Sequence, residues 1–257
     1  MTVTETTTSD TYYRHGWWRR DATLVDDLRA ATQAHPDRRA VVCWHIDGRP
    51  ADALTYAQLS AEVDRIAVGL LRLGVRSGDV VTLQLPNSVW LVASCLACVR
   101  VGAVPGPVLP IMRGREVEFM LRLTNSPVYI AASAHRGFSL DRMSAEIQRS
   151  VPTLRHRILL DGTDQARAGG ALDFDAALRG AEPTAAELAE LDARRPRPDD
   201  LAQVIFTSGT TGEPKGVMHT HNTLHAINRV QADLLGLTPD EIRAKDPFLA
   251  TLLSTRQ

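Results

Sequence analysis

The chain has 257 residues and a formal net charge of −1, from 29 Lys and Arg against 30 Asp and Glu. Hydrophobic residues make up 44% and charged residues 23%, which argues against a disordered or fibrous chain. Without a basic excess, duplex nucleic acid is not an expected partner, because phosphate neutralisation dominates that affinity. No apolar run reaches about 18 residues, so we expect no membrane span. Three cysteines suit a reducing cytoplasm better than a disulfide scaffold.

Residues 1–19 are predicted to be a flexible N-terminal tail followed by an aromatic arm. Residues 1–11 are polar and lack an apolar h-region, so they do not resemble a secretory signal. Two interpretations of the arm stay open: packing of its aromatic rings onto the domain, which we favour, and a nucleic-acid or membrane patch. The arm contains Tyr12, Tyr13, Trp17, Trp18, Arg19 and Arg20. Asp21 is the predicted N-cap of a helix through Leu24 and Leu28.

From residue 40 onward, predicted strands and helices alternate. The strands are 41–46, 53–56, 80–85, 128–131 and 158–160, and residues 103–109 are extended. The helices are 57–73, 88–101, 116–123 and 140–149. This alternation predicts an α/β fold, a mainly parallel sheet flanked by helices.

Residues 161–200 are rich in Ala, Asp, Arg, Gly and Pro, and they end in several arginines and prolines. We predict a surface excursion with a short helix or two, followed by a linker. The run Arg194-Arg195-Pro196-Arg197 is interpreted as a solvated loop rather than a phosphate site. Residues 201–207 are then predicted to form one more buried strand.

The segment 206–216 carries the chemistry, with the sequence Phe-Thr-Ser-Gly-Thr-Thr-Gly-Glu-Pro-Lys-Gly. Its glycines let backbone N–H groups converge into an anion nest, and its Ser and Thr hydroxyls add donors. Lys215 supplies a mobile charge suited to phosphate oxygens, and Pro214 stiffens the exit from the loop. We therefore predict a loop that grips a polyphosphate tail; the alternative is a flexible polar surface loop. The spacing fits neither the Walker loop nor the dinucleotide fingerprint.

Residues 207–216 resemble the signature phosphate-binding loop of the adenylate-forming superfamily, which includes acyl-CoA synthetases, peptide-synthetase adenylation domains and luciferases. All ten positions fit, with Glu213 at the variable position. The run Val217-Met218-His219-Thr220-His221 continues the resemblance as a strand that leads into a helix at Asn222. Residues 54–59, 74–79 and 85–88 are similar to the family as well. The resemblance implies that residues 20–257 are an incomplete N-terminal domain of the adenylate-forming fold.

The resemblance also implies a reaction and its cofactors. ATP and a carboxylic acid would give an acyl-adenylate and pyrophosphate, and a thiol, usually coenzyme A, would take the acyl group. Lys215 would be the catalytic residue, Mg²⁺ would bridge the phosphates, and Thr211 would lie beside the metal. The implied nucleotide-binding residues are Thr207, Ser208, Gly209, Thr210, Thr211, Gly212, Pro214, Lys215 and Gly216.

The branch of the family is indicated by residues 101–110, which lack the Tyr-Val-Pro-x-Asp form of many peptide-synthetase adenylation domains. They resemble acid–CoA ligases that act on fatty, alicyclic or aromatic acids, as does the Trp17-Trp18 opening. Two alternatives stay open: a fragment of a peptide-synthetase adenylation domain, and a non-catalytic nucleotide-binding remnant.

Family members are much longer than this chain, and their ribose-binding and C-terminal lysine motifs are not found before Gln257. We therefore expect a truncated N-terminal portion without the C-terminal domain, inactive alone. Faces that the other half would cover are expected to promote self-association.

Cysteine and histidine pairs offer weaker signals. Cys95 and Cys98 lie in an apolar predicted helix, where core packing is favoured over a zinc or redox pair. His219, His221 and His225 are interpreted as local hydrogen-bonding or site-contacting residues rather than metal ligands.

Overall fold

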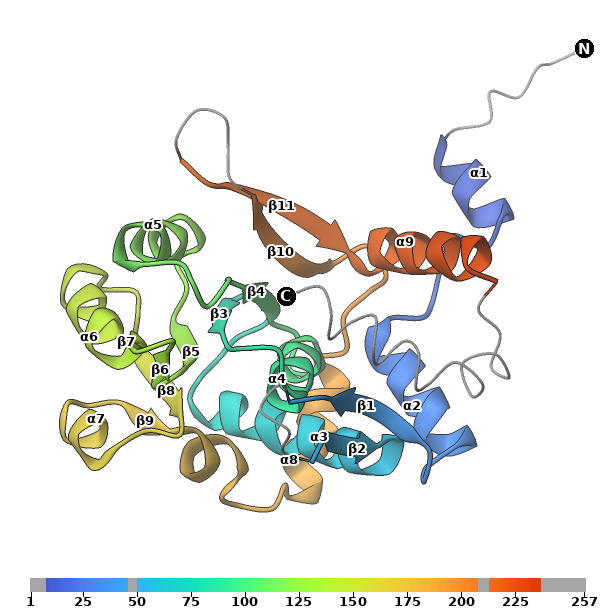
Figure 1. Cartoon of the computed structure of the whole chain (residues 1–257). Coiled ribbons are helices and arrows are strands. Elements are labelled where there is room, and N and C mark those ends of the chain that lie inside the picture. Colours follow the sequence, from blue (N-terminus) through green and yellow to red (C-terminus); the bar gives the residue numbers. More distant parts are fainter. Residues whose placement is uncertain (1–7, 46–49, 208–212, 237–257) are drawn as a thin grey trace, which may run out of the picture.

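A five-stranded parallel sheet in the order β4-β3-β5-β8-β9 forms the centre of the fold (Figure 1). The computed structural model describes residues 8–45, 50–207 and 213–236. The strands are β3 (Val80–Gln84), β4 (Val104–Pro107), β5 (Val128–Ala132), β8 (His156–Leu160) and β9 (Leu172–Asp173). Every neighbouring pair in this sheet is parallel. The predicted α/β class with a mainly parallel sheet is confirmed.

Four longer helices cover the two faces of this sheet. They are α3 (Tyr56–Arg72), α4 (Val89–Arg100), α5 (Gly114–Thr124) and α6 (Leu140–Ser150). Side chains of β5 alternate between the two faces, as the pleat of a strand requires. Val128 and Ile130 join the core beneath α3 and α4, whereas Tyr129 and Ala131 join the core beneath α5 and α6. The sheet therefore separates two hydrophobic clusters.

The N-terminal region contains α1 (Thr8–Arg14), α2 (Leu24–Ala34) and an antiparallel pair, β1 (Arg39–Cys43) with β2 (Asp52–Thr55). The N-cap of α2 is Thr23, so the prediction of Asp21 is wrong. The carboxylate of Asp26, three residues after Thr23, accepts a 2.8 Å hydrogen bond from the Thr23 N–H. That spacing is the capping box, which Asp21 does not offer.

Residues 161–200 contribute to the core, so the prediction of a surface excursion is wrong, whereas the short helices predicted there are present. They form α7 (Asp164–Ala168), β9, the single-turn π-helix η1 (Asp175–Arg179) and α8 (Ala185–Ala193). β9 is the fifth strand of the parallel sheet, and Phe174, Leu178 and Leu191 are buried in the cluster beneath α3 and α4. Each of these elements is so short that its few buried apolar residues do not produce a helical or strand periodicity in the sequence.

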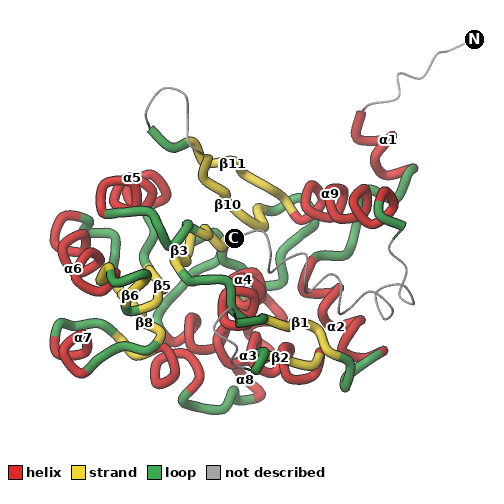
Figure 2. The backbone as a smooth tube through the Cα atoms, viewed as in Figure 1, coloured by secondary structure: helices red, strands yellow, loops and turns green. Residues whose placement is uncertain are grey.

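An antiparallel hairpin of β10 (Leu201–Thr207) and β11 (Lys215–Thr220) lies beside β4, at the end of the sheet, and continues into α9 (His221–Leu234) (Figures 1 and 2). A second, very short hairpin consists of β6 (Ala134–His135) and β7 (Phe138–Ser139). The prediction that 201–207 is a buried strand is wrong in its burial, because only Ala202 and Val204 of β10 are buried. Burial alternates along β10 because the strand lies in a two-stranded hairpin that is covered on one face only.

Large apolar side chains are exposed on the hairpin and on α9. They include Leu201, Ile205, Val217, Met218, Ile227, Val230 and Leu234. Self-association through such faces stays a prediction. None of the helices in the described ranges is both long and apolar enough to cross a bilayer.

Candidate phosphate-binding site

The β10–β11 hairpin brings together the two ends of the predicted phosphate loop. Its pairing runs from Leu201 opposite Thr220 to Thr207 opposite Lys215. Thr207, Pro214, Lys215 and Gly216 are therefore placed at one end of the hairpin. The predicted loop residues Ser208, Gly209, Thr210, Thr211 and Gly212 lie outside the described residues.

Gly216 leaves room where β11 passes Phe206. The two residues are paired in the hairpin, and a Cβ added at Gly216 would lie 3.2 Å from Val204 Cγ1 and 3.4 Å from Phe206 Cε1. Phe206 in turn packs against the core cluster beneath α5 and α6. The glycine thus lets an aromatic ring anchor the base of the loop to the parallel sheet domain.

Lys215 begins β11 and is exposed. Among the described residues, no carboxylate forms an ion pair with its ammonium group. The nearest acidic residue in sequence, Glu213, is paired instead with Arg115 of α5, with 3.1 Å between Arg115 Nη2 and Glu213 Oε1. The Lys215 ammonium is therefore available to an anionic ligand at the end of the hairpin.

The outgoing end of the hairpin is fixed by the first turn of α9 and the N-terminal arm. Asn222 is buried; its Oδ1 accepts a 2.7 Å hydrogen bond from the Arg19 N–H, and its Nδ2 donates to Arg19 O at 3.1 Å and to Asp199 Oδ1 at 2.8 Å. His225 Nδ1 lies 2.9 Å from the carbonyl oxygen of Trp17. The backbone of the arm is therefore bonded to the domain, while the ring of Tyr12 packs against Trp17 and Trp18 within the arm, and packing of the rings onto the domain stays a prediction.

Comparison with known proteins decides the family. The family model described as "AMP-binding enzyme" matches residues 28–252. The chain belongs to the AMP-binding enzyme family.

Relatives and solved structures agree with this assignment. The chain is 30% identical over 231 residues to the medium-chain fatty-acid–CoA ligase of Escherichia coli (strain K12), covering 90% of this chain and 38% of that protein. It is 31% identical over 232 residues to the salicyl-AMP ligase / salicyl-S-ArCP synthetase of Mycobacterium tuberculosis (strain ATCC 25618 / H37Rv), covering 90% and 39%. The apo structure of Mycobacterium smegmatis MbtA superposes with a TM-score of 0.72 at 31% identity, covering 89% of this chain and 39% of that one. The chain therefore spans less than half the length of these relatives.

In this AMP-binding chain, hydrogen bonding is predicted for His219, His221 and His225, and His221 and His225 bond to the N-terminal region rather than to neighbours in sequence. His221 is buried, and its Nδ1 lies 3.5 Å from the Leu24 N–H nitrogen that donates to it. Its Nε2 is also buried and has no hydrogen-bond partner among the described residues. Across the described ranges, no group of three or more His, Cys, Asp and Glu side chains could hold a metal ion.

Acid is expected to destabilise the fold through His221. Burial lowers the pKa of the imidazole below its ordinary value of 6.5; Arg19 also lowers it, while Asp200, Asp26 and Asp27 oppose the shift. Because the unfolded chain then binds more protons than the folded one, stability is retained above about pH 6.5 and is lost as the pH falls through the window just below it.

Urea unfolding at pH 7.5 and at pH 5.5 measures this loss. One proton contributes at most about 1.4 kcal/mol per pH unit. His221→Gln, which keeps an acceptor for the Leu24 N–H, should lose less stability between the two pH values than the wild type. An equal loss in both proteins would contradict the role of His221.

The two helical cysteines pack in the core. Cys98 is buried in the cluster beneath α3 and α4, and Cys95 packs against that cluster. Burial raises the pKa of the Cys95 thiol to about 12, so it stays protonated and unreactive at neutral pH. The favoured interpretation of core packing is confirmed.

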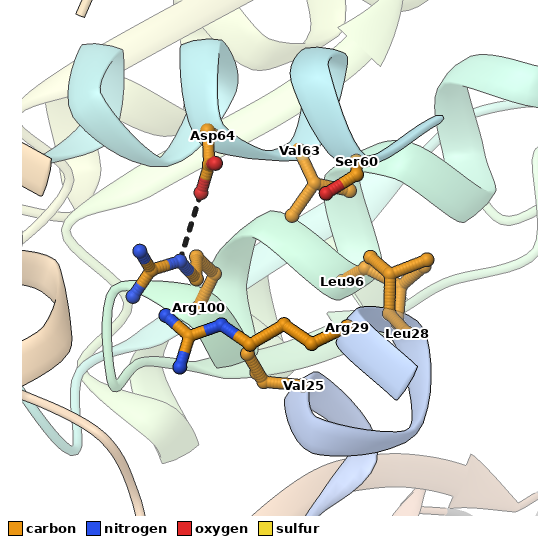
Figure 3. Close-up of a pocket in the computed structure, with 8 residues that line it drawn as sticks. All are labelled: Val25, Leu28, Arg29, Ser60, Val63, Asp64, Leu96 and Arg100. Atoms are coloured by element: carbon orange, nitrogen blue, oxygen red, sulfur yellow. Dashed lines mark hydrogen bonds and ion pairs between the residues drawn. The ribbon is translucent and has the colours of Figure 1, made fainter. Parts of the chain in front are cut away.

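A small pocket lies between α2, α3 and α4 (Figure 3). Its charged groups already satisfy one another: Arg100 Nε donates to Asp64 Oδ1 at 2.8 Å, and Arg100 Nη2 lies 2.9 Å from Asp192 Oδ1. Apolar residues such as Val25, Val63 and Leu96 complete the lining. The pocket thus lies at a contact between helices that ion pairs hold together, and none of its lining residues belongs to the hairpin.

The sequence indicated the loop and Lys215 as candidates, which stay predictions, but it did not indicate the residues that contact the two ends of the hairpin. Arg115 lies 98 positions before Glu213, and Arg19 lies 203 positions before Asn222. Glu213 stood out only as a variable position of the motif. No local pattern could have connected these pairs.

Proposed function

We propose that the chain supplies the phosphate-gripping part of an AMP-forming acid–thiol ligase. The observation that carries the proposal is the register of the hairpin, which sets Thr207 opposite Lys215 at the two ends of the loop, with the Lys215 ammonium unpaired by any described carboxylate. Membership of the AMP-binding family supports the same role.

The composition adds weight to Lys215. The chain uses arginine throughout and has two lysines, Lys215 and Lys245. An ammonium group is a compact point charge on a flexible stem, and it can follow a phosphate that moves during a reaction. One of the two lysines of this arginine-rich chain therefore lies at the end of the hairpin.

The proposed reaction begins with ATP and a carboxylic acid. A carboxylate oxygen attacks the α-phosphorus, an acyl–phosphate bond forms, and the bond to the β-phosphate breaks with release of pyrophosphate. The Lys215 ammonium holds the β- and γ-phosphates and offsets the charge that develops on the leaving pyrophosphate. A thiol then attacks the acyl carbon, and AMP leaves. Mg²⁺ would neutralise phosphate charge, but its proposed neighbour Thr211 lies outside the described residues.

We propose a fatty, alicyclic or aromatic acid as the substrate and coenzyme A as the acceptor, in a cytoplasmic setting. The fatty-acid–CoA ligase among the relatives supports this acceptor. A second candidate, transfer to the thiol of a carrier protein, is favoured by the relative whose name includes salicyl-S-ArCP synthetase. Acid-dependent thioester formation with each thiol, assayed after supplying the remainder of a relative, separates the two candidates.

Lys215→Ala is expected to weaken ATP binding by about 10- to 100-fold, because a charge-assisted hydrogen bond contributes about 1.5–3 kcal/mol. Isothermal titration calorimetry of ATP and of adenosine measures the effect. Adenosine affinity should be unchanged, since it carries no phosphate.

Lys245→Ala is the matched control, because it removes the same chemical group outside the loop motif. It should bind ATP as the wild type does. Equal ATP affinity in Lys215→Ala and the wild type would remove Lys215 from the site.

A further inference from the structure

Arg115 and Glu213 form an ion pair beside the end of the β10–β11 hairpin. The distance from Arg115 Nη2 to Glu213 Oε1 is 3.1 Å, and the side chains are 80% and 53% exposed. We propose that Arg115 is a second cation for the polyphosphate, held by Glu213 until a phosphate group displaces that carboxylate. The inference rests on the proposed function of the hairpin.

The Arg115–Glu213 ion pair joins the hairpin to the first turn of α5, and the base of the hairpin packs on the core beneath that helix. Phe206, next to the end of β10, packs against the cluster that contains Val117, Met120 and Leu121 of α5. In Figure 1 the loop end of the hairpin lies next to α5. Glu213 precedes Lys215 by two residues, so the ion pair places the guanidinium of Arg115 near the start of the strand that carries Lys215.

Helix stability does not explain an arginine at position 115. Arg115 lies in the first turn of α5, where a cation opposes the helix dipole. The capping role there belongs to Glu116, whose Oε2 accepts a 3.3 Å hydrogen bond from the Arg113 N–H. The guanidinium of Arg113 is hydrogen-bonded to the backbone, with Nη1 donating to the Ile111 carbonyl at 2.7 Å. Arg115 is therefore the arginine of this turn that is free to exchange its partner.

The chemistry favours an exchange from carboxylate to phosphate. A guanidinium presents a planar fork of N–H donors that fits two phosphate oxygens, and a polyphosphate carries more negative charge than one carboxylate. Glu213 has the opposite effect, because its carboxylate repels the phosphates and competes for Arg115. The two members of the pair should therefore influence polyphosphate binding in opposite directions.

Calorimetric titration with tripolyphosphate and with ATP tests this opposition. Arg115→Gln should weaken binding about tenfold, as expected for loss of a charge-assisted contact. Glu213→Gln should tighten binding about threefold, as expected for removal of an exposed like charge. Arg122→Gln, on the same helix and paired with Glu118, is the control and should bind as the wild type does.

The outcomes separate this inference from the proposed function. If Arg115→Gln and Glu213→Gln both weaken binding, or if neither changes it, while Lys215→Ala does weaken it, Arg115 is not a phosphate cation and the proposed function stands. If the wild-type chain does not bind tripolyphosphate or ATP, both the proposed function and the role of Arg115 are overturned. Circular dichroism of each variant confirms that it is folded.

Discussion

Gly69→Ala is expected to destabilise the chain by about 2–3 kcal/mol, near the upper end of what overpacking of a core costs. Gly69 lies in the last turn of α3, where the helix meets η1. A Cβ at this position would lie 2.5 Å from Leu178 Cα, 2.9 Å from Leu178 O and 3.0 Å from Ala177 O. These are backbone atoms, so the clash can be relieved only by moving η1 away from α3. The gain in helix propensity from alanine, about 1 kcal/mol, offsets part of the cost.

Gly114→Ala provides the control, because it makes the same substitution at the first position of α5. The nearest atom to a Cβ there is Met143 Cγ at 3.7 Å, which is an ordinary contact. This variant should be as stable as the wild type or slightly more stable. Urea unfolding followed by tryptophan fluorescence measures both changes. A Gly69→Ala protein as stable as Gly114→Ala would show that η1 does not pack rigidly on α3.

The parallel sheet could be predicted from the sequence because its strands and helices carry strong periods. Val63, Ile66 and Leu70 recur at helical spacing on α3, and the structure buries all three. The apolar run of β5, and that of β3 with its buried Thr82 and Gln84, are typical of strands covered on both faces. These signals are local, so they can be read before the fold is known.

The segment 161–200 could not be predicted because its contribution to the core is not local. β9 contains two residues, and it becomes a strand only because Ile158 and Leu159 of β8 are already in place to pair with it. Leu178 is buried because α3 offers it a surface at Gly69, and the ring of Phe174 packs edge-on against Trp90 of α4. A polar composition with a few apolar residues indicates a loop until that surface is known.

The candidate site likewise has a part that could be predicted from the sequence and a part that could not. The motif of 207–216 is recognisable because glycines, hydroxyls and a lysine fall within a short span, and the antiparallel register then sets Thr207 opposite Lys215. The ion-pair partner of Glu213 comes from α5, and the groups that fix the opposite end of the hairpin come from the N-terminal arm. Their positions depend on how the sheet stacks its helices, which a single sequence does not encode in any local pattern.

Asp141→Ala is expected to destabilise the chain by about 3 kcal/mol or more, because it leaves a buried charge without its counter-ion. Arg157 on β8 is 1% exposed, and its Nη1 lies 2.9 Å from Asp141 Oδ1. The same guanidinium donates to Gln148 Oε1 at 2.8 Å and to the Gly169 carbonyl at 2.6 Å, so it ties β8 to α6 and to the end of α7. The remaining neutral acceptors cannot replace the lost carboxylate.

Arg157→Met separates the cost of the buried charge from the cost of lost packing. Its apolar side chain keeps much of the arginine's volume, and the Asp141 carboxylate that it leaves is 21% exposed and can be solvated. Arg157→Met should therefore be less destabilising than Asp141→Ala, and the double variant should be more stable than Asp141→Ala alone. Guanidinium unfolding of the three variants gives the complete cycle. A double variant whose loss equals the sum of the single losses would show that the two residues act independently, and the buried charge would then not explain the effect.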